Sequence, residues 1–366
     1  MKTRTLPALS MCALAAIFTS AGIASRAENA PKHSYQTVRI AEGVVAFIAS
    51  ESNTGIVSGN CIAIIGEDGV LVVDSTSFPS QARQIIAEIK QMTNQPIRFL
   101  VHTHWHPDHL MGDGEFRAAF PGIAFVSTAY TQKAIAELAP KYIRGNAERG
   151  AAAAIAMRKQ IQEGKRQNGQ PLSDADKKYL TDYANSVDFA VPEYKQYQSV
   201  LPNVVFNDSL SIRLGKREVQ ILFLGRGNTA GDAVIYVPDA KTVITGDLLV
   251  APTPYSYGSF ISDWIVTLGK IKALGATTII PGHGPVWHDT AYLDLLSSAL
   301  SYVQTQAQAA VAKHVSLEDA RKQIDLTEFQ KKFCGADHDR EIAFKMGFTD
   351  QVIERAYEEA KFAAED

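Results

Sequence analysis

The sequence is poor in cysteine, and it lacks both an excess of positive charge and a long apolar run within its folded part. It contains 3 cysteines in 366 residues, which excludes a small scaffold held together by disulfides. Its 36 basic and 39 acidic residues give a formal net charge of −3, so the chain has no general reason to bind nucleic acid. A hydrophobic content of 46% is enough for a large globular core. We therefore expect a small-molecule substrate as the partner, and the sequence does not fix an oligomeric state.

Two cysteines remain once the N-terminal segment that contains Cys12 is set aside. An exported location would permit a disulfide between Cys61 and Cys334. The apolar run around Cys61 instead favours a buried free thiol. Neither cysteine has the neighbours that are typical of a metal ligand, so we expect free thiols.

The N-terminal 27 residues have the order of a secretory signal peptide. Lys2 and Arg4 precede an apolar run over residues 6–18, and the small residues that follow allow cleavage after Ala24 or Ala27. The apolar run is too short to span a membrane comfortably, so no stable membrane anchor is expected after cleavage. Cleavage after Ala27 removes three basic residues and no acidic one, which moves the formal charge from −3 to −6. We predict a periplasmic or secreted protein.

The rest of the chain alternates between strand and helix patterns. Short β-rich runs are followed by helical periodicity over residues 80–93 and by an apolar strand that ends at Val101. This strand–helix–strand unit predicts a mixed α/β architecture. The predicted organisation is a linker over 28–37, a main domain over 38–295 with a charged helical insertion at about 140–198, and a helical C-terminal extension over 296–366.

The densest cluster of metal-ligand side chains follows that apolar strand, in the run His104-Trp105-His106-Pro107-Asp108-His109. His104 and His106 are two residues apart, so in an extended chain their side chains point to the same side. Pro107 ends the strand and turns the chain, which brings Asp108 and His109 onto the turn. Imidazole and carboxylate are common ligands of zinc. The spacing predicts two pairs of ligands that face one pocket, which suits two metal ions better than one.

Ligand-type residues also follow other predicted strands: Asp74, Asn228, Asp247 and His283. Loops at strand ends are where α/β proteins carry their chemistry. Asp74 is suited either to orienting an imidazole from behind or to capping a turn, and its position alone does not separate these roles. Three aromatic residues near the motifs are candidates for substrate contact: Trp105, Tyr255 and Tyr257.

Taken together, these motifs resemble the metallo-β-lactamase superfamily, from about residue 38 to residue 295. The resemblance rests on Asp74, His104-x-His106-x-Asp108-His109, Gly225-x-Gly227-Asn228-Thr229, Gly246-Asp247 and Gly282-His283-Gly284. It implies an αβ/βα sandwich of two facing mixed β-sheets with helices outside and metals at one edge. It also implies the ligand roles: His104 and His106 for the first metal, Asp108, His109 and His283 for the second, and Asp247 as the bridge. Zinc, one ion or two, is the cofactor that the resemblance implies.

Asn228 departs from the family pattern, which usually has a third histidine for the first metal at this position. An amide oxygen is a harder and weaker zinc ligand than imidazole. Three outcomes are open: the first site is weakly occupied, Asn228 binds the metal directly or through water and favours Mn²⁺ or Fe²⁺, or another histidine such as His102 or His288 substitutes. We expect a working centre in which the two sites are unequal.

The predicted function is an exported hydrolase that uses a metal-activated hydroxide on an ester, a lactone, a thioester or a related bond. Asp108 is the candidate catalytic residue, as a ligand that positions the nucleophile and relays a proton. One alternative is a β-lactamase that hydrolyses β-lactam antibiotics. It ranks second because β-lactamases of this fold usually carry Cys or Ser where Asp247 stands. The other alternative is a non-catalytic binder with a degraded first site.

Overall fold

The computed structural model describes residues 35–50 and 58–365. The predicted signal peptide and residues 28–34 of the predicted linker lie outside the described residues. The last three residues of that linker, 35–37, belong to the first strand, β1, instead. Both remaining cysteines are buried free thiols.

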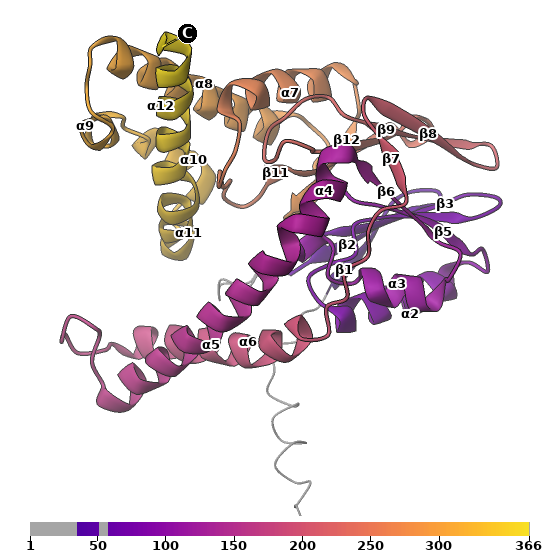
Figure 1. The fold of residues 1–366 in the computed structure, drawn as a ribbon, viewed down its shortest axis with the longest axis horizontal. Coiled ribbons are helices and arrows are strands. Elements are labelled where there is room, and N and C mark those ends of the chain that lie inside the picture. The colour runs from indigo at the N-terminus through magenta and orange to yellow at the C-terminus, as the bar shows by residue number, and fades with distance from the viewer. Residues whose placement is uncertain (1–34, 51–57, 366) are drawn as a thin grey trace, which may run out of the picture. The chain divides into compact units, whose positions relative to one another are not determined.

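The first sheet has seven strands in the order in which they occur along the chain (Figure 1). Its strands are β1 (Tyr35–Ala41), β2 (Val44–Ala49), β3 (Cys61–Ile65), β4 (Val70–Val73), β5 (Ile97–Val101), β6 (Ala124–Thr128) and β7 (Val204–Phe206). The pairs from β1 to β4 are antiparallel, and those from β4 to β7 are parallel. Parallel pairing requires crossovers. They contain α2 (Pro79–Met92), α3 (Asp113–Ala119), α4 (Ala129–Glu137), α5 (Ala139–Glu163) and α6 (Asp174–Tyr194).

The second sheet has five strands in the order β12-β11-β10-β9-β8. They are β8 (Ser209–Leu214), β9 (Arg217–Leu222), β10 (Val234–Val237), β11 (Thr242–Val250) and β12 (Thr278–His283). Only β11 and β12 pair in parallel, and the crossover between them contains α7 (Ile261–Ala273). The remaining pairs are antiparallel, so this sheet is also mixed.

The two sheets pack face to face and are covered by helices on their outer sides. Apolar residues of both sheets, such as Ile64, Val101, Ile235 and Ile280, form one buried cluster between them. A second cluster joins the outer side of the first sheet to α2 and α3, and a third joins the second sheet to α7 and the C-terminal helices. This arrangement of layers is the αβ/βα sandwich that the family resemblance implies.

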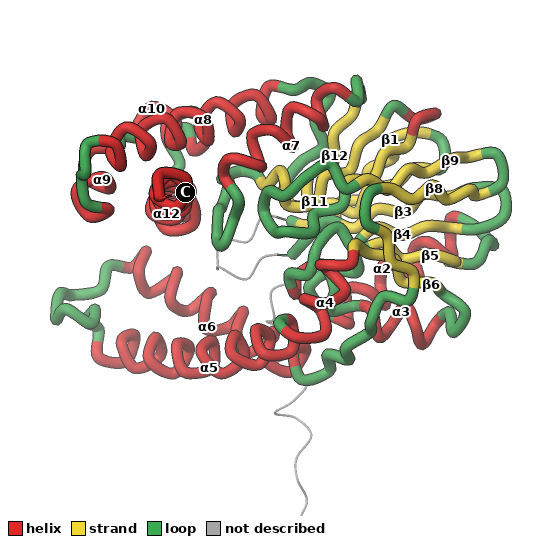
Figure 2. The backbone as a smooth tube through the Cα atoms, turned by 45° about the horizontal axis from the view of Figure 1, so that its top comes forward, coloured by secondary structure: helices red, strands yellow, loops and turns green. Residues whose placement is uncertain are grey.

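The segment predicted as a helical insertion contains α5 and α6, which pack against each other as a hairpin (Figure 2). Ser173 caps the start of α6 by accepting a hydrogen bond from the Asp176 amide, and the Asp176 side chain accepts one from the Ser173 amide in return. At the base of the hairpin, Ala139 and Ile143 pack on Leu110 and Met111, directly after the His104–His109 motif. The insertion therefore supports the loop that carries the motif.

Helices fill the chain after β12. They are α8 (Ala291–Ala312), α9 (Leu317–Gln323), α10 (Thr327–Cys334), α11 (His338–Phe344), the π-helical turn Lys345–Thr349 and α12 (Asp350–Glu365). Helix α8 runs across the predicted boundary at residue 295. Among the described residues, no helix combines the length and the apolar character that crossing a membrane requires.

The predicted ligands lie at the carboxyl ends of β5 and β12, and Asp74 follows β4, but β11 differs from the prediction. The sequence predicts a strand over 242–245 with Asp247 just after it, whereas β11 continues to Val250 and Asp247 lies inside it. The pairing of β11 with β12 shifts register on both sides of Gly246, which has φ +51°. A side chain at Gly246 would lie 2.5 Å from Thr103 Cβ, so glycine lets the strand bend here without ending.

Candidate metal centre

Four side chains from three separate segments converge on one point, which is the predicted second metal site. His109 Nε2 lies 3.2 Å from His283 Nε2 and 3.2 Å from Asp247 Oδ1. His283 Nε2 lies 3.0 Å from Asp108 Oδ2 and 3.4 Å from Asp247 Oδ1, and His109 Nε2 lies 3.5 Å from Asp108 Oδ2. With zinc–ligand bonds of about 2.0–2.1 Å, tetrahedral ligand atoms lie about 3.3 Å from one another. The spacing of these four atoms fits one divalent cation.

The predicted first site is on the other side of the Asp247 carboxylate. His104 Nε2 lies 3.4 Å from Asp247 Oδ2, and ligand atoms of His104, His106 and Asp247 all lie within 4.8 Å of one another. Asp247 thus presents one oxygen to each group of histidines, as a bridging ligand does. Among the described residues, His104 Nε2 and Asp247 Oδ1 have no hydrogen-bond partner although both are buried. Such atoms are costly to bury unless a further group binds them, which supports a fit to metal at both positions.

Two imidazoles are oriented by Asp74, which lies behind the centre at the end of β4. Its Oδ2 accepts from His109 Nδ1 at 2.9 Å and from Thr103 Oγ1 at 2.7 Å. Thr103 Oγ1 in turn lies 2.9 Å from His104 Nδ1. Since Thr103 donates its hydroxyl proton to Asp74, it accepts the Nδ1 proton of His104. Both imidazoles therefore keep Nε2 free for a metal, which favours the orienting role for Asp74 over that of a turn cap.

Close backbone approach places His283 and Asp247 side by side. A side chain at Gly282 would lie 2.0 Å from Asp247 Oδ1, so only glycine leaves room for the carboxylate. Asn60, at the start of β3, donates from its side-chain amide to the carbonyls of Pro281 and Gly284, both at 3.0 Å. The turn that carries His283 is thereby tied to the first sheet.

Asn228 is buried beside Tyr255, and the Tyr255 hydroxyl contacts two of the first-site ligands. The Tyr255 hydroxyl is 3.1 Å from His106 Nδ1 and donates a hydrogen bond to Asp247 Oδ2. The buried Asn228 amide lies beside this hydroxyl, but among the described residues neither of its polar atoms makes a hydrogen bond of good geometry. Sequence reasoning identified Tyr255 only as a candidate for substrate contact.

Neither of the two histidines named as substitutes for the missing third imidazole belongs to the groups of converging ligands among the described residues. His102 is fully buried behind the motif, where its Nε2 lies 3.1 Å from Asp113 Oδ2. His288 lies beyond β12, with its Nδ1 3.3 Å from Thr278 Oγ1. The buried pair of His102 and Asp113, to which Ser75 donates at 2.7 Å, was not predicted, because neither residue falls in the ligand pattern.

Opposite charges dominate the electrostatics of the centre. Burial alone would raise the pKa of Asp108 and of Asp247, but the neighbouring imidazoles hold both values well below the ordinary range. Burial likewise opposes charge on His109 and His283, and the carboxylates of Asp247 and Asp108 nevertheless raise their pKa values. Asp108 has 21% of its side chain exposed, whereas Asp247 is fully buried. Of these two carboxylates, Asp108 is the one that a substrate can reach.

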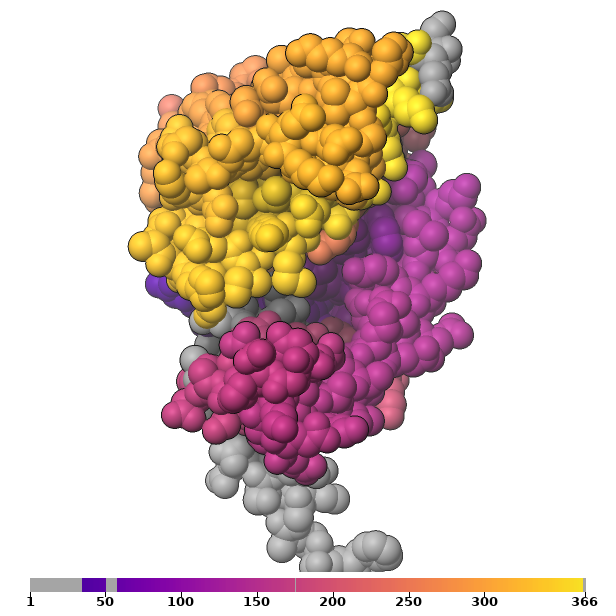
Figure 3. Space-filling view, turned by 90° about the vertical axis from the view of Figure 1, so that its left-hand side faces the viewer, coloured from indigo at the N-terminus to yellow at the C-terminus, as the bar shows by residue number. Residues whose placement is uncertain are grey.

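The predicted aromatic residues extend from the centre towards the surface. The Trp105 ring lies 4.8 Å from that of His106 and 6.0 Å from that of Tyr142 on α5. Tyr257 follows Tyr255 in the same loop, with ring centroids 6.0 Å apart. Figure 3 shows the α5–α6 hairpin in magenta below the C-terminal helices in orange and yellow.

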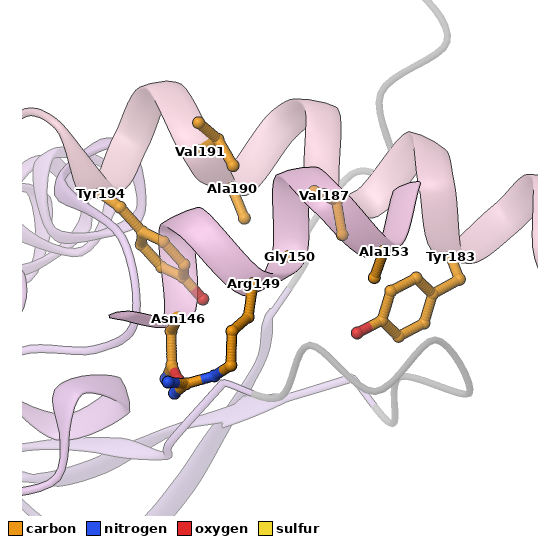
Figure 4. Close-up of a pocket in the computed structure, with 9 residues that line it drawn as sticks. All are labelled: Asn146, Arg149, Gly150, Ala153, Tyr183, Val187, Ala190, Val191 and Tyr194. Atoms are coloured by element: carbon orange, nitrogen blue, oxygen red, sulfur yellow. The ribbon is translucent and has the colours of Figure 1, made fainter. Parts of the chain in front are cut away.

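A separate cavity of about 300 Å³ lies within the α5–α6 hairpin (Figure 4). Arg149, Tyr183, Val187 and Tyr194 are among the residues that line it. It contains none of the candidate metal ligands, so we do not assign the chemistry to it.

Comparison with known proteins gives the family and several relatives. The profile of the Metallo-beta-lactamase superfamily matches residues 54–283. A linear primary-alkylsulfatase from Pseudomonas sp. (strain ATCC 19151) is 24% identical over 270 residues, which cover 71% of this chain and 48% of that protein. A type 2 metallo-β-lactamase from Bacteroides fragilis is 28% identical over 114 residues, which cover 30% of this chain and 45% of that protein. The matches thus span about half the length of these curated relatives.

Among solved structures, a metallo-β-lactamase from Pontibacter korlensis superposes with a TM-score of 0.51 at 18% sequence identity. The superposition covers 73% of this chain and 99% of that one, and it shows a shared fold. The profile match includes the His104–His109 motif and ends at His283, the last of the convergent ligands. The chain belongs to the metallo-β-lactamase superfamily.

Proposed function

We propose that this protein is an exported metal-dependent hydrolase that cleaves an ester, a lactone, a thioester or a related bond in a small molecule. One observation carries the proposal: the Asp247 carboxylate presents one oxygen to His104 and the other to His109 and His283. A bridging carboxylate between two clusters of ligands is the arrangement of a dinuclear hydrolytic centre.

When bound, a divalent cation supplies a nucleophile from water at neutral pH and polarises the oxygen of the scissile bond. The protein's own part is to hold and orient the reacting groups. Asp74 and Thr103 fix the imidazole tautomers of His109 and His104. Asp247 contacts both groups of ligands and so fixes their separation. Asp108, the partly exposed carboxylate, accepts a hydrogen bond from the attacking water and carries a proton to the leaving group.

The aromatic surface beside the centre supports a substrate with an apolar portion. Tyr142, Tyr257 and Met346 are 47%, 52% and 66% exposed. Tyr257 donates a hydrogen bond to the Met346 carbonyl at 3.2 Å, so Tyr257 and Met346 are neighbours on this surface. The name of the Pseudomonas relative refers to linear primary alkyl sulfates, which are sulfate esters of apolar chains. Alkyl sulfates therefore belong in the proposed range beside carboxylic esters.

The direct test is turnover of a panel that contains p-nitrophenyl esters of increasing acyl length, acyl-lactones, thioesters and linear alkyl sulfates. We expect activity that zinc restores after chelation and that rises with chain length. Asp108→Asn should lower kcat by about 10²–10⁴-fold on the best substrate. Asp188→Asn, on the exposed side of α6, is the matched control. Unchanged turnover in Asp108→Asn would show that Asp108 does not have the proposed role.

A β-lactamase is the second candidate, favoured by the matches to type 2 metallo-β-lactamases from Bacteroides fragilis and Elizabethkingia meningoseptica. These matches cover 30% and 28% of the chain, against 71% for the alkylsulfatase. Nitrocefin and a carbapenem in the same panel test it, and efficient carbapenem turnover would reverse the ranking. Absence of bound metal together with no turnover after zinc addition would favour a non-catalytic binder.

Export is the part of the proposal that rests on residues 1–27 alone. Expression of the full chain in a bacterium, followed by fractionation and N-terminal sequencing, tests it. We expect a mature protein in the periplasm or the medium that begins after Ala24 or Ala27. An uncleaved chain in the cytoplasm would contradict export and leave the hydrolase proposal standing.

A further inference from the structure

The loop that follows β11 brings a tyrosine hydroxyl to the first metal site. Tyr255 lies 149 residues after His106 in the sequence, and its hydroxyl is 3.1 Å from His106 Nδ1. The same hydroxyl donates to Asp247 Oδ2, which is the oxygen that faces His104. It therefore contacts two of the three ligands assigned to this site, and Asn228 lies beside it.

The loop around Tyr255 is fixed on its outer side by the C-terminal helices. The Ser256 amide donates to the Gly347 carbonyl at 3.0 Å, and the Tyr257 hydroxyl donates to the Met346 carbonyl at 3.2 Å. A Cβ atom at Gly347 would lie 3.4 Å from Tyr255 Cβ, so the backbone of the π-helical turn packs closely on the tyrosine. These contacts hold the ring against the centre from behind.

The hydroxyl lies close to the place that a fourth ligand of the first metal would take. His104 Nε2, His106 Nδ1 and Asp247 Oδ2 provide three donor atoms, and a tetrahedral site needs a fourth at about 3.3 Å from the others. The distance of 3.1 Å from Tyr255 Oη to His106 Nδ1 is near this spacing, whereas the hydrogen bond to Asp247 Oδ2 is shorter and must lengthen when a metal binds. Asn228 is shorter than the histidine usual in the family and leaves the place beside Asp247 to the phenol.

We propose that the phenol oxygen of Tyr255 is a ligand of the first metal and replaces the imidazole that Asn228 does not supply. On coordination, the proton that Tyr255 now donates to Asp247 is released to solvent. Each metal would then be held by two imidazole nitrogens and two oxygens of the protein, and a fifth position would remain for water. The ligands of the first metal would come from His104, His106, Asp247 and Tyr255. Those of the second metal would come from His109, His283, Asp247 and Asp108. A harder oxygen in place of an imidazole shifts the preference of the first site from zinc towards Mn²⁺ or Fe²⁺.

A double-mutant cycle of metal binding tests the inference without any substrate, so its result is independent of the hydrolase proposal. Zinc content and affinity are measured for the full chain and for three variants: Tyr255→Phe, Asn228→His and the double variant. We expect two zinc ions in the wild-type protein and loss of one in Tyr255→Phe, with at least a tenfold weaker first site. The double variant should regain the second ion, because the introduced imidazole replaces the phenol. Tyr257→Phe, in the same loop, should keep both.

The effect of Tyr255→Phe is compared in the protein with Asn228 and in the variant with His at that position. This comparison separates a metal ligand from a residue that only supports the fold. If Tyr255→Phe acted by disturbing the fold, it would lower metal binding equally with Asn228 and with His at that position. Equal losses in both backgrounds would therefore overturn the inference. Unchanged or tighter zinc binding in Tyr255→Phe would overturn it as well, since the phenol would then be a bystander or a competitor of the metal.

Discussion

At the scale of single residues, the centre depends on groups that do not touch the metal. Asp74 determines the tautomer of His109 directly and that of His104 through Thr103. Outer groups of this kind typically change metal affinity by about 10–100-fold when they are lost. Because both metal sites share Asp74, we expect its loss to affect both.

We predict that Asp74→Asn weakens zinc binding by about 10–100-fold at each site. The amide can still accept from Thr103, but it no longer attracts the Nδ1 proton of His109 as a carboxylate does. Competition with a chromophoric chelator measures the two affinities. Asp68→Asn, which alters only a surface ion pair with Arg98, is the control. Weaker zinc binding at the second site alone would show that the hydrogen bonds from Asp74 through Thr103 do not orient His104.

A second prediction concerns the pH dependence of metal binding at the second site. Burial opposes protonation of His109 and His283, yet Asp247 and Asp108 raise the pKa of both, so the metal-free imidazoles hold protons at a higher pH than ordinary histidines. Zinc must displace these protons. Affinity at this site should therefore increase as pH rises from about 6 to 8. Burial and His104 lower the pKa of His106 to about 3, so it contributes no such proton.

Calorimetric titration of the metal-free protein in buffers with different ionisation enthalpies counts the protons released. We expect net release at neutral pH, and more of it at pH 6 than at pH 8. A zinc affinity that does not vary over this range would mean that His109 and His283 are already neutral.

At the scale of helices and strands, one carboxylate joins the C-terminal helix to the sandwich. Glu359 on α12 accepts from the amides of Ile261 and Ser262 at 2.7 and 2.9 Å, at the start of α7. The first residues of a helix have amides without partners inside the helix, and a negative charge there also complements the helix dipole.

We predict that Glu359→Ala lowers the free energy of unfolding by about 0.5–2 kcal/mol, the range for a lost N-terminal cap. Glu358→Ala is the matched control, because the Glu358 carboxylate forms an ion pair with Arg355 on the same helix and, among the described residues, does not contact α7. Urea denaturation followed by circular dichroism gives both values. Equal destabilisation by the two substitutions would exclude a specific capping role for Glu359.

The strands and the local motif were predictable because they depend on short-range patterns. His104 to His109 lie within six positions of the sequence, and the alternation from strand to turn brings them together. Tyr255 was not assigned to the centre, because the contact joins residues 149 positions apart and the loop has no ligand pattern. The bend in β11 also escaped prediction: Gly246 suggested the end of a strand, whereas it allows the strand to bend and continue.

At the scale of the whole molecule, the C-terminal helices share a core with the second sheet. Phe344, Phe348 and Val352 belong to the same buried cluster as Trp264 on α7 and Val243 on β11. A terminal extension that merely rested on the domain would have its own core. This one completes the outer layer, so we expect it to unfold together with the sandwich.

We predict that Phe348→Ala lowers the stability of the entire fold by about 3–5 kcal/mol, since it opens a cavity in the shared core. Tryptophan fluorescence and far-ultraviolet circular dichroism should report one transition at the same, lower denaturant concentration. Phe362→Ala, which removes a ring that is 68% exposed, should change little. Two separate transitions would indicate that the C-terminal helices fold independently.

The loop from Tyr255 to Tyr257 has a thermodynamic consequence of its own. On one side it contacts His106 and Asp247, and on the other it is hydrogen-bonded to the backbone of Met346 and Gly347. If docking of the last helices tightens metal binding through this loop, the bound metal must strengthen that docking by the same factor, because coupling free energies are reciprocal. Chelation would then increase amide hydrogen exchange in α11 and α12, far along the chain from the histidine motif. The end of the chain would thus report whether the centre is loaded.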